Sequence, residues 1–333
     1  AASGGGEVQE LPGNRRGVPM SRKFQVKSVP STWLENNGRR LDCGPYLSGA
    51  MEARELLRKH RTSPLQDLTA GYNGGIFNGP RFPRIYVEDA RHGVPFLGST
   101  DILAADLSSL SLLSTKQVRD NPDLVIDEGW TLITCSGTIG RAAYARPDMK
   151  GMAGSQHFMR VAPDVSKIKS GYLYAYLSSR YGVPIVVSGT YGAIIQHIEP
   201  HHIADLPVPR LGPIEDDAHD LIQRAAKLRS EAAKTIDAST NALLKQLDLP
   251  ALEFSDVSRL GWSSVSSTDL RRRLDAPYHS PAALEAEAAI KNSRYPCKQL
   301  SAVAKRLFKP PIFKRLWVDN ETYGRQFISG TDA

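Results

Sequence analysis

The longest continuous amphipathic pattern in the chain runs from Pro213 to Leu249. This stretch has no internal Gly or Pro, and Gly212 precedes it while Pro250 follows it. Its first turns carry a proline and acidic residues at positions 215, 216, 217 and 220. Carboxylates at that position stabilise a helix because they complement its dipole. We therefore predict a single helix, about 50 Å long at 1.5 Å per residue.

Apolar residues within this helix recur at the coiled-coil period. The first six step by alternating fours and threes: Ile214, Ala218, Leu221, Ala225, Leu228 and Ala232. A stripe that alternates large and small residues lets two helices pack closely. We expect a seam through Ile214, Leu221, Leu228, Leu243 and Leu247 that packs against a partner helix, and that stays partly unpaired unless another chain covers it.

The chain before the helix alternates short apolar runs with turn-forming residues. We predict strands at residues 84–87, 94–98, 130–135, 142–145, 158–162, 185–187 and 194–198, and helices at about 45–60 and 172–181. The tyrosines and leucines at 172, 173, 176 and 177 have the spacing of core residues. Short strands mixed with a few helices indicate an α+β domain. We place a disordered leader at residues 1–20, this domain at 21–211 and the spacer helix at 212–250.

The sequence restarts after the helix. Arg40-Leu41-Asp42 and Pro45-Tyr46 reappear as Arg273-Leu274-Asp275 and Pro277-Tyr278, and residues 76–102 match residues 307–333 without a gap, with nine identities in 27 positions. A period of this length is too long for a solenoid repeat and indicates a duplicated domain. We expect residues 251–333 to form the first part of a second, similar domain that is truncated within a longer protein.

The composition is that of a globular protein with a basic surface. Hydrophobic residues make up 41% of the 333 residues, and the formal net charge is +7. This charge favours a polyanionic partner such as nucleic acid, although a basic surface without such a partner is an alternative. The three cysteines lie far apart at 43, 135 and 297, which indicates a reducing compartment. No apolar run is long enough for a membrane span, so we expect a cytoplasmic protein.

Motifs for catalysis are not found in the sequence. It has no phosphate-binding loop with its Lys-Ser/Thr and no Asn/Asp-Pro-Pro-Tyr/Phe tetrapeptide of the kind found in amino-methyltransferases. Pro122-Asp123 is not followed by the lysine that a nuclease site would need, and we interpret it as a turn. Cys135 fits a buried strand cysteine better than a nucleophile. We predict no enzymatic activity, no catalytic residue, no cofactor and no metal.

The densest histidine group is His197, His201 and His202. A metal site would need a third or fourth ligand with convergent geometry, and Glu199 is the one candidate close in sequence. We interpret the histidines as a strand-to-loop junction, with contact to a phosphate as the functional alternative.

The most informative local motif is Thr-Cys-Ser-Gly-Thr-Ile-Gly-Arg at residues 134–141. Hydroxyl and backbone N–H groups at a glycine-rich turn can contact phosphate, and an arginine can reach a guanine edge. The alternative is a tight hairpin turn with its glycines at positive φ, and one loop can serve both purposes. Our candidate DNA-binding residues are Ser136, Thr138, Arg141, Gln156 and Tyr191.

With this arrangement the sequence resembles the specificity (S) subunit of type I restriction-modification systems. The resemblance rests on Gly-Trp-Thr-Leu-Ile and Ser-Gly-Thr-Ile-Gly within residues 129–140, and on Gln-His-Ile followed by Leu-Pro-Val-Pro within residues 196–209. It also rests on the long helix and on the restart after it, and it covers nearly everything from about residue 21 onward.

The resemblance implies a non-catalytic DNA reader. Each globular domain would be a target-recognition domain that reads half of a split site in double-stranded DNA. The long helices would pair, fix the spacing between the halves and dock methyltransferase (M) subunits, with restriction (R) subunits as further partners. The rival hypothesis is a protein–protein interaction scaffold without DNA specificity, or a half-subunit that works as a homodimer.

Overall fold

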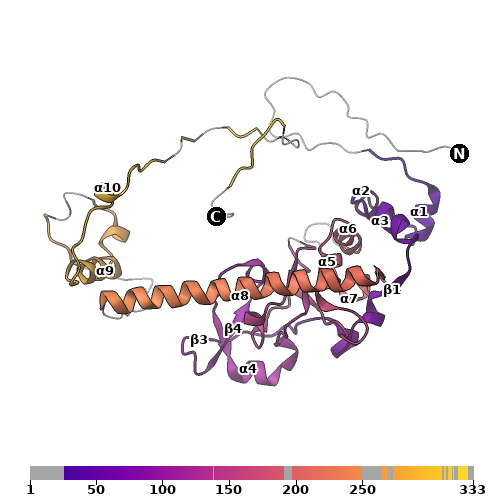
Figure 1. Ribbon diagram of the computed structural model, residues 1–333, viewed down its shortest axis with the longest axis horizontal. Coiled ribbons are helices and arrows are strands. Elements are labelled where there is room, and N and C mark those ends of the chain that lie inside the picture. Colours follow the sequence, from indigo (N-terminus) through magenta and orange to yellow (C-terminus); the bar gives the residue numbers. More distant parts are fainter. Residues whose placement is uncertain are drawn as a thin grey trace. The chain divides into compact units, whose positions relative to one another are not determined.

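The computed structural model describes residues 26–137, 139–190, 197–249, 264–268, 270, 273–309, 311–312, 314–316, 318 and 322–328. The chain divides into two compact units, residues 1–237 and residues 238–333. The boundary falls inside the long helix α8 (Pro213–Leu247), which Figure 1 shows as one continuous rod. The predicted helix is therefore confirmed, and it ends two residues earlier than expected. The predicted leader at residues 1–20 lies outside the described residues.

The first unit mixes short helices and short strands, as the sequence indicates. Its helices are α1 (Ser31–Asn36), α2 (Gly44–Leu47), α3 (Ala50–Leu57), α4 (Thr115–Asp120), α5 (Ser170–Leu177), α6 (Gly182–Ser188) and α7 (Pro200–Ile203). Its strands are β1 (Thr62–Pro64), β2 (Ile76–Asn78), β3 (Tyr86–Val87), β4 (Gly93–Leu97), β5 (Leu112–Ser114), β6 (Thr131–Thr134), β7 (Ala142–Tyr144), β8 (Ala153–Gly154), β9 (Phe158–Val161) and β10 (Pro207–Pro209).

The strands form two four-stranded sheets and one pair. The first sheet has the order β2-β9-β6-β7 and is antiparallel throughout, with Leu132 of β6 opposite Arg160 of β9. The second has the order β3-β5-β4-β8, in which β4 and β8 run parallel. Strands β1 and β10 form the pair that carries the chain into α8.

The first sheet separates two hydrophobic cores. Because side chains alternate between the faces of a strand, Ile133 and Met159 pack with residues of α3, α5 and α6, whereas Leu132 and Phe158 pack in a second core with Leu97 of β4. The two leucines and two tyrosines predicted as core in α5 are all buried in the first of these cores.

Two predicted elements are wrong. Residues 185–187 were expected as a strand, but they belong to helix α6. Pro184 is tolerated in the first turn of that helix, and burial of Ile185 and Val186 in the core outweighs the β-propensity of the branched residues. The helix expected at about 45–60 is broken in two, because Gly49 adopts a left-handed φ of 84° between α2 and α3.

Arg160 connects the two four-stranded sheets. Its guanidinium is fully buried and donates through Nη1 to the carbonyls of Ser155 and Phe158, at 3.2 Å each. Nη2 donates to Leu124 at 3.3 Å and to Gly154 of β8, in the other sheet, at 2.7 Å. Burial lowers its pKa to about 10, so the side chain stays charged at neutral pH.

The described part of the second unit contains a 3-10 turn at Ala276–His279, α9 (Pro281–Lys291) and α10 (Leu300–Val303). Two contacts of the first repeat recur in it. Arg273 forms the same two-pronged pair with Asp275, at 2.6 and 2.7 Å, that Arg40 forms with Asp42. A second pair, Arg315 over Phe327 at 4.7 Å, reproduces Arg84 over Phe96 at 5.0 Å. The interpretation of this unit as a second domain stays a prediction.

No helix in the described part of the chain combines the length and the hydropathy needed to cross a bilayer.

Replacing Arg160 by Met is expected to lower the free energy of unfolding by about 3 kcal/mol, because four buried carbonyl groups lose a charged donor. Urea unfolding followed by circular dichroism measures this. The matched control is Arg39→Met, which removes a surface pair with Glu35 and is expected to change stability by less than about 0.5 kcal/mol. Equal stability of the two variants would contradict the role assigned to Arg160.

Candidate nucleic-acid interface

Three loops meet at one end of the first sheet: the loop after β2, the turn between β6 and β7, and the loop before β9. Neighbouring strands of an antiparallel sheet run in opposite directions, so the carboxyl ends of β2 and β6 lie beside the amino ends of β9 and β7. Polar and cationic side chains follow or precede each of these strand ends. We call this set the sheet-end surface, and its members are Arg81, Arg84, Ser136, Arg141, Gln156 and His157.

A line of hydrogen bonds crosses the sheet-end surface. Nη2 of Arg84 donates to Oε1 of Gln156 at 2.5 Å. Nε2 of Gln156 lies 3.2 Å from Nε2 of His157, and Nδ1 of His157 lies 2.8 Å from Oγ of Ser136. Two of the predicted DNA-binding residues, Ser136 and Gln156, are thereby brought together although they lie 20 residues apart in the sequence.

The surroundings of His157 are cationic. Partial burial lowers its pKa, and the charges of Arg84, Arg81 and His197 lower it further. The imidazole is therefore held neutral next to fixed positive charge. A cluster of this kind attracts anions, because a phosphate offsets the repulsion among the cations.

The turn between β6 and β7 carries Ser136 and Arg141 on its two sides. Gly137 and Gly140 have φ values of 77° and 83°, so the hairpin interpretation of residues 134–141 is confirmed. A Cβ atom on Gly140 would lie 2.5 Å from Cγ2 of Val187, which shows that the turn packs directly on α6. Arg141 is exposed, and its backbone N–H donates to Oγ1 of Thr134 at 3.1 Å.

The remaining two predicted DNA-binding residues, Thr138 and Tyr191, lie outside the described residues. Arg81 and Arg84 were not among the predicted DNA-binding residues, and no specific role was predicted for His157. A signal for Arg84 was present, because Arg84/Arg315 and Phe96/Phe327 are both identities of the internal repeat. The structure joins the residues of each pair in a cation–π contact.

The other chemical candidates have structural roles. Cys135 is buried, its thiol donates to the carbonyl of Gln156 at 3.4 Å, and burial followed by the charge of Glu199 raises its pKa to about 11. Nδ1 of His202 accepts the backbone N–H of Glu199 at 3.0 Å in the cap of α7. Among the residues that the structure describes, no group of three or more His, Cys, Asp or Glu side chains is placed to hold a metal ion.

Helix α8 turns one face toward the domain. Ala226 and Ser230 are buried there. Nε2 of Gln223 donates to the hydroxyl of Tyr144 at 2.8 Å, and Oγ of Ser230 donates to Oδ1 of Asp148 at 2.7 Å. The helix is thus fixed to the domain by side-chain hydrogen bonds as well as by apolar contact.

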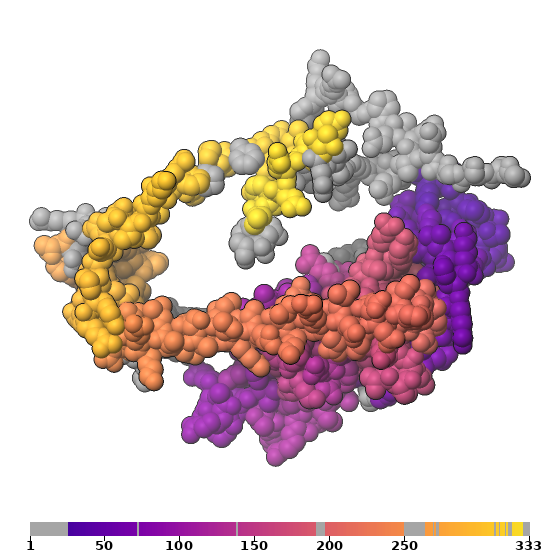
Figure 2. Space-filling model, in the orientation of Figure 1, coloured from indigo at the N-terminus to yellow at the C-terminus, as the bar shows by residue number. Residues whose placement is uncertain are grey.

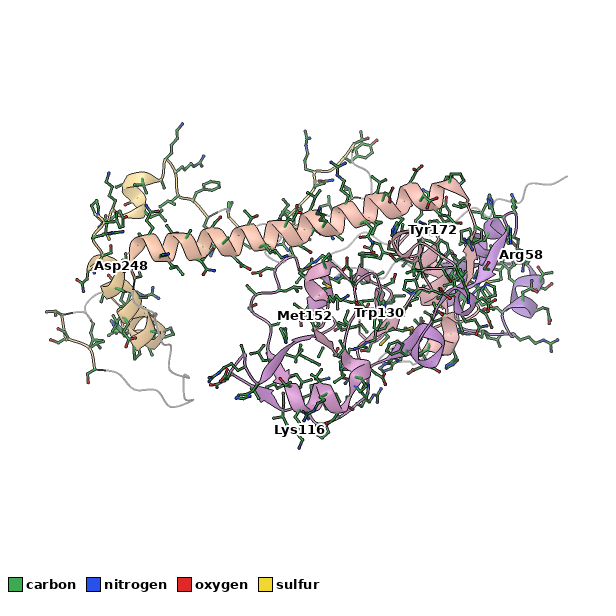
Figure 3. The ribbon with its side chains drawn as sticks, turned by 60° about the horizontal axis from the view of Figure 1, so that its bottom comes forward. Arg58, Lys116, Trp130, Met152, Tyr172 and Asp248 are labelled. Carbon is green, nitrogen blue, oxygen red and sulfur yellow. The ribbon has the colours of Figure 1, made fainter. Side chains whose placement is uncertain are left out.

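A second face of the helix is apolar and exposed. Ile214, Leu221, Leu228 and Leu243 of the predicted seam are exposed by 58, 67, 55 and 56%, and Leu247 is half-buried. At 100° per residue, this stripe lies roughly 160° around the helix from the stripe of Gln223, Ala226 and Ser230 that faces the domain, so the two are on nearly opposite sides. Figure 2 shows α8 with one side open along its length, and Figure 3 shows side chains projecting from both sides of it. Ala218 was placed in the seam, but it packs against the domain core.

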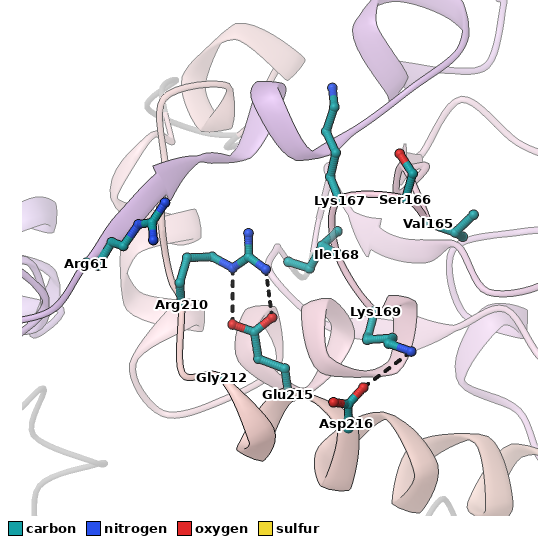
Figure 4. A pocket seen from close by; sticks show the side chains of 10 residues that line it. All are labelled: Arg61, Val165, Ser166, Lys167, Ile168, Lys169, Arg210, Gly212, Glu215 and Asp216. Carbon is teal, nitrogen blue, oxygen red and sulfur yellow. Dashed lines mark hydrogen bonds and ion pairs between the residues drawn. The ribbon is translucent and has the colours of Figure 1, made fainter.

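The start of α8 is held by a buried carboxylate. Nε and Nη2 of Arg210 donate to the two oxygens of Glu215 at 3.1 and 2.9 Å, and the N–H of Leu211 donates to Oε1 at 2.7 Å (Figure 4). Burial acts to raise the pKa of Glu215, but the hydrogen bonds from Arg210 and Leu211 outweigh it and the pKa lies below its usual value. Lys169 and Asp216 form a second pair at 3.3 Å beside it.

These pairs line a cavity of about 660 Å³ between Arg61, the 165–169 loop and the first turn of α8. Both acids that line the cavity form ion pairs with two of its four cations, Lys169 and Arg210. We therefore assign the cavity to the anchoring of the helix.

No protein-family model matches the sequence, and no curated protein matches it. Among solved structures, the chain is similar to a type I restriction-modification system S subunit from M. genitalium, with 13% identity and a TM-score of 0.32 over 58% of this chain and 50% of that one. It is similar to the HsdS subunit from Thermoanaerobacter tengcongensis, with 17% identity and a TM-score of 0.36 over 66% and 54% of the two chains.

The chain is also similar to a third structure, from work on the complex assembly and conformational transition of the type I R-M system. The identity is 15% and the TM-score 0.36, over 66% of this chain and 54% of that one. All three are type I restriction-modification proteins, the class that the sequence resembles. The chain spans about half the length of each of them.

Replacing Glu215 by Gln is expected to lower the free energy of unfolding by about 2 kcal/mol at pH 7, because the buried pair with Arg210 is broken. The folded-state pKa of Glu215 is depressed, so its contribution is present above the unfolded value of 4.5 and is lost as the pH falls through the lower folded value. The difference in free energy of unfolding between the wild type and the Glu215→Gln variant should therefore become smaller below about pH 4.5.

Urea unfolding at pH 7, 5 and 3.5 measures this difference. Asp216→Asn serves as the control, since that carboxylate is exposed and pairs with an exposed lysine. A loss of stability that is the same at all three pH values would contradict the assigned role of Glu215.

Proposed function

We propose that this chain is a non-catalytic, sequence-specific DNA-binding specificity subunit of a type I restriction-modification system. Its first domain reads one half of a bipartite site in double-stranded DNA. Its long helix docks methyltransferase subunits and so directs methylation and host defence to that site. The proposal joins the sequence resemblance to the surfaces that the fold assembles.

The sheet-end surface is the observation that carries the DNA-binding part of the proposal. Three arginines supply fixed positive charge for phosphate contacts, which dominate affinity for duplex DNA. An amide, a hydroxyl and a guanidinium on loops are the groups that read base edges. A protein–protein scaffold without DNA specificity would not require this combination of cations and hydrogen-bonding groups at one end of a sheet.

The long helix supports the docking part of the proposal. One face is fixed to the domain, so the direction of the helix is set relative to the sheet-end surface. The seam formed by Ile214, Leu221 and Leu228 leaves large apolar side chains in water, and covering them with a second helix would stabilise the assembly. If residues 251–333 begin a second reader, a rigid rod between two readers would convert helix length into a base-pair spacing.

The exposed seam also favours a second candidate, a scaffold or half-subunit that pairs with another copy through this helix. The first function requires binding to duplex DNA, and the second does not. A gel-shift experiment with the full chain and a pool of random-sequence duplexes, at low and moderate salt, separates them. Binding that weakens with salt supports the DNA reader, and no binding at either salt supports the scaffold. Methyl transfer from S-adenosylmethionine by the purified chain alone would reject the non-catalytic assignment.

Replacing Arg141 by Ala is expected to weaken binding to duplexes selected from this pool by about tenfold. The slope of log affinity against log salt should fall by about 1, as for the loss of one phosphate contact. Arg39→Ala, which removes an exposed arginine outside the sheet-end surface, is the charge-matched control. Unchanged affinity in the Arg141 variant would remove the 134–141 turn from the interface.

Replacing Leu221 and Leu228 together by Glu is expected to abolish association through the seam without unfolding the domain, because both side chains are exposed. Analytical ultracentrifugation of the chain alone and with the methyltransferase subunit of the same system measures the association. The double variant Arg224→Glu and Lys227→Glu, at polar positions of the same helix, is the control. Retained association in the leucine variant would place the contact elsewhere.

A further inference from the structure

The hydrogen bonds across the sheet-end surface have a fixed direction. A guanidinium donates and cannot accept, so Arg84 must face the carbonyl oxygen of the Gln156 amide, as it does at 2.5 Å. The amide nitrogen of Gln156 then points to Nε2 of His157 at 3.2 Å. Because that nitrogen can only donate, Nε2 of His157 must accept and carries no proton.

The donor and acceptor roles of the imidazole also determine the role of the serine. A neutral imidazole that is unprotonated at Nε2 carries its proton at Nδ1, and Nδ1 lies 2.8 Å from Oγ of Ser136. The imidazole therefore donates to the hydroxyl oxygen. Since the oxygen accepts this bond, the hydroxyl proton of Ser136 points elsewhere and is held ready to donate.

We propose that Arg84 is a positioning residue that, through Gln156 and the neutral imidazole of His157, fixes Ser136 as a hydrogen-bond donor toward an acceptor oxygen or nitrogen of DNA. This inference rests on the proposed function, because it assigns a polarity to one contact of the same surface. It explains why two arginines stand next to a histidine: their charge keeps the ring from taking up a second proton.

The groups that face His157 agree with a neutral ring. Arg84 and Arg81 from the loop after β2 and His197 from the segment opposite Ser136 all act to lower the pKa of His157, as does its partial burial. A proton on Nε2 would also stand against the N–H group of Gln156. Lowering the pH should therefore protonate His157 at Nε2 and break its contact with Gln156, while Nδ1–H still donates to Ser136.

The first test reads the imidazole itself, without DNA. In the full chain labelled with ¹⁵N-histidine, NMR at pH 7.5 should show His157 protonated at Nδ1 and unprotonated at Nε2. Arg84→Met frees the amide of Gln156 to rotate and should shift His157 toward the more common Nε2–H tautomer, whereas Arg84→Lys keeps a donor and should restore the Nδ1–H form. A His157 that is Nε2–H or doubly protonated in the wild type, or unaffected by Arg84→Met, overturns the proposal.

The second test asks whether the donor is used. With duplexes selected from a random pool, Ser136→Ala should weaken binding about five- to tenfold. Arg84→Met should cost clearly less affinity in the Ser136→Ala background than in the wild type, because both changes remove the same contact. Equal losses in the two backgrounds overturn the positioning role. A wild-type chain that binds none of the duplexes overturns the proposed function, and this inference with it, whatever the tautomer.

Discussion

The fold depends on one buried cation. Arg160 stands in β9, one of the two inner strands of the first sheet, and donates four hydrogen bonds to carbonyl groups, one of them in the second sheet. Burying a guanidinium without a carboxylate partner is unfavourable unless hydrogen bonds replace its hydration, and here carbonyls and two phenylalanine rings surround it. Space for it requires glycine nearby, since a Cβ on Gly154 would lie 2.7 Å from Nη2 and one on Gly79 would lie 3.1 Å from Nη1. A shift of the second sheet relative to the first would break the 2.7 Å hydrogen bond from Nη2 of Arg160 to Gly154.

The same cation positions the candidate interface. Its partner Ser155 directly precedes Gln156 and His157, and its partner Phe158 directly follows them. The loop that carries the amide and the imidazole is therefore fixed at both ends by the core. Positioning on a rigid loop matters because a hydrogen-bond donor that must read a base edge has to be in place before DNA arrives. The candidate interface uses few residues, but the loop that carries Gln156 and His157 is attached at both ends to the packed core of the two sheets.

The long helix and the internal repeat concern the part of the chain beyond the two sheets. The carboxylate of Glu215 and the polar contacts of Gln223 and Ser230 leave the helix one orientation on the domain. That orientation decides which apolar stripe remains in water. In the second unit, Arg315 and Phe327 repeat the contact of Arg84 and Phe96 although the described residues of that segment form no strand. The contact is therefore local to the repeated sequence, whereas the sheets of the first unit need strands contributed by residues 131–161.

The sequence by itself determined the elements whose signal is local. The helix from Pro213 was predictable because its caps, its charges and its period lie within one stretch, and strands such as 130–135 and 158–162 were predictable from short apolar runs between turns. Residues 185–187 were mispredicted because burial, which depends on distant partners, overrode β-propensity. Ser136, Arg141 and Gln156 were found as candidates from local motifs, but nothing local joins Ser136 to Gln156, or either of them to Arg84. Only the antiparallel order of β2, β9, β6 and β7 brings those loops to one end, because strand pairing is set by contacts between residues far apart in the chain.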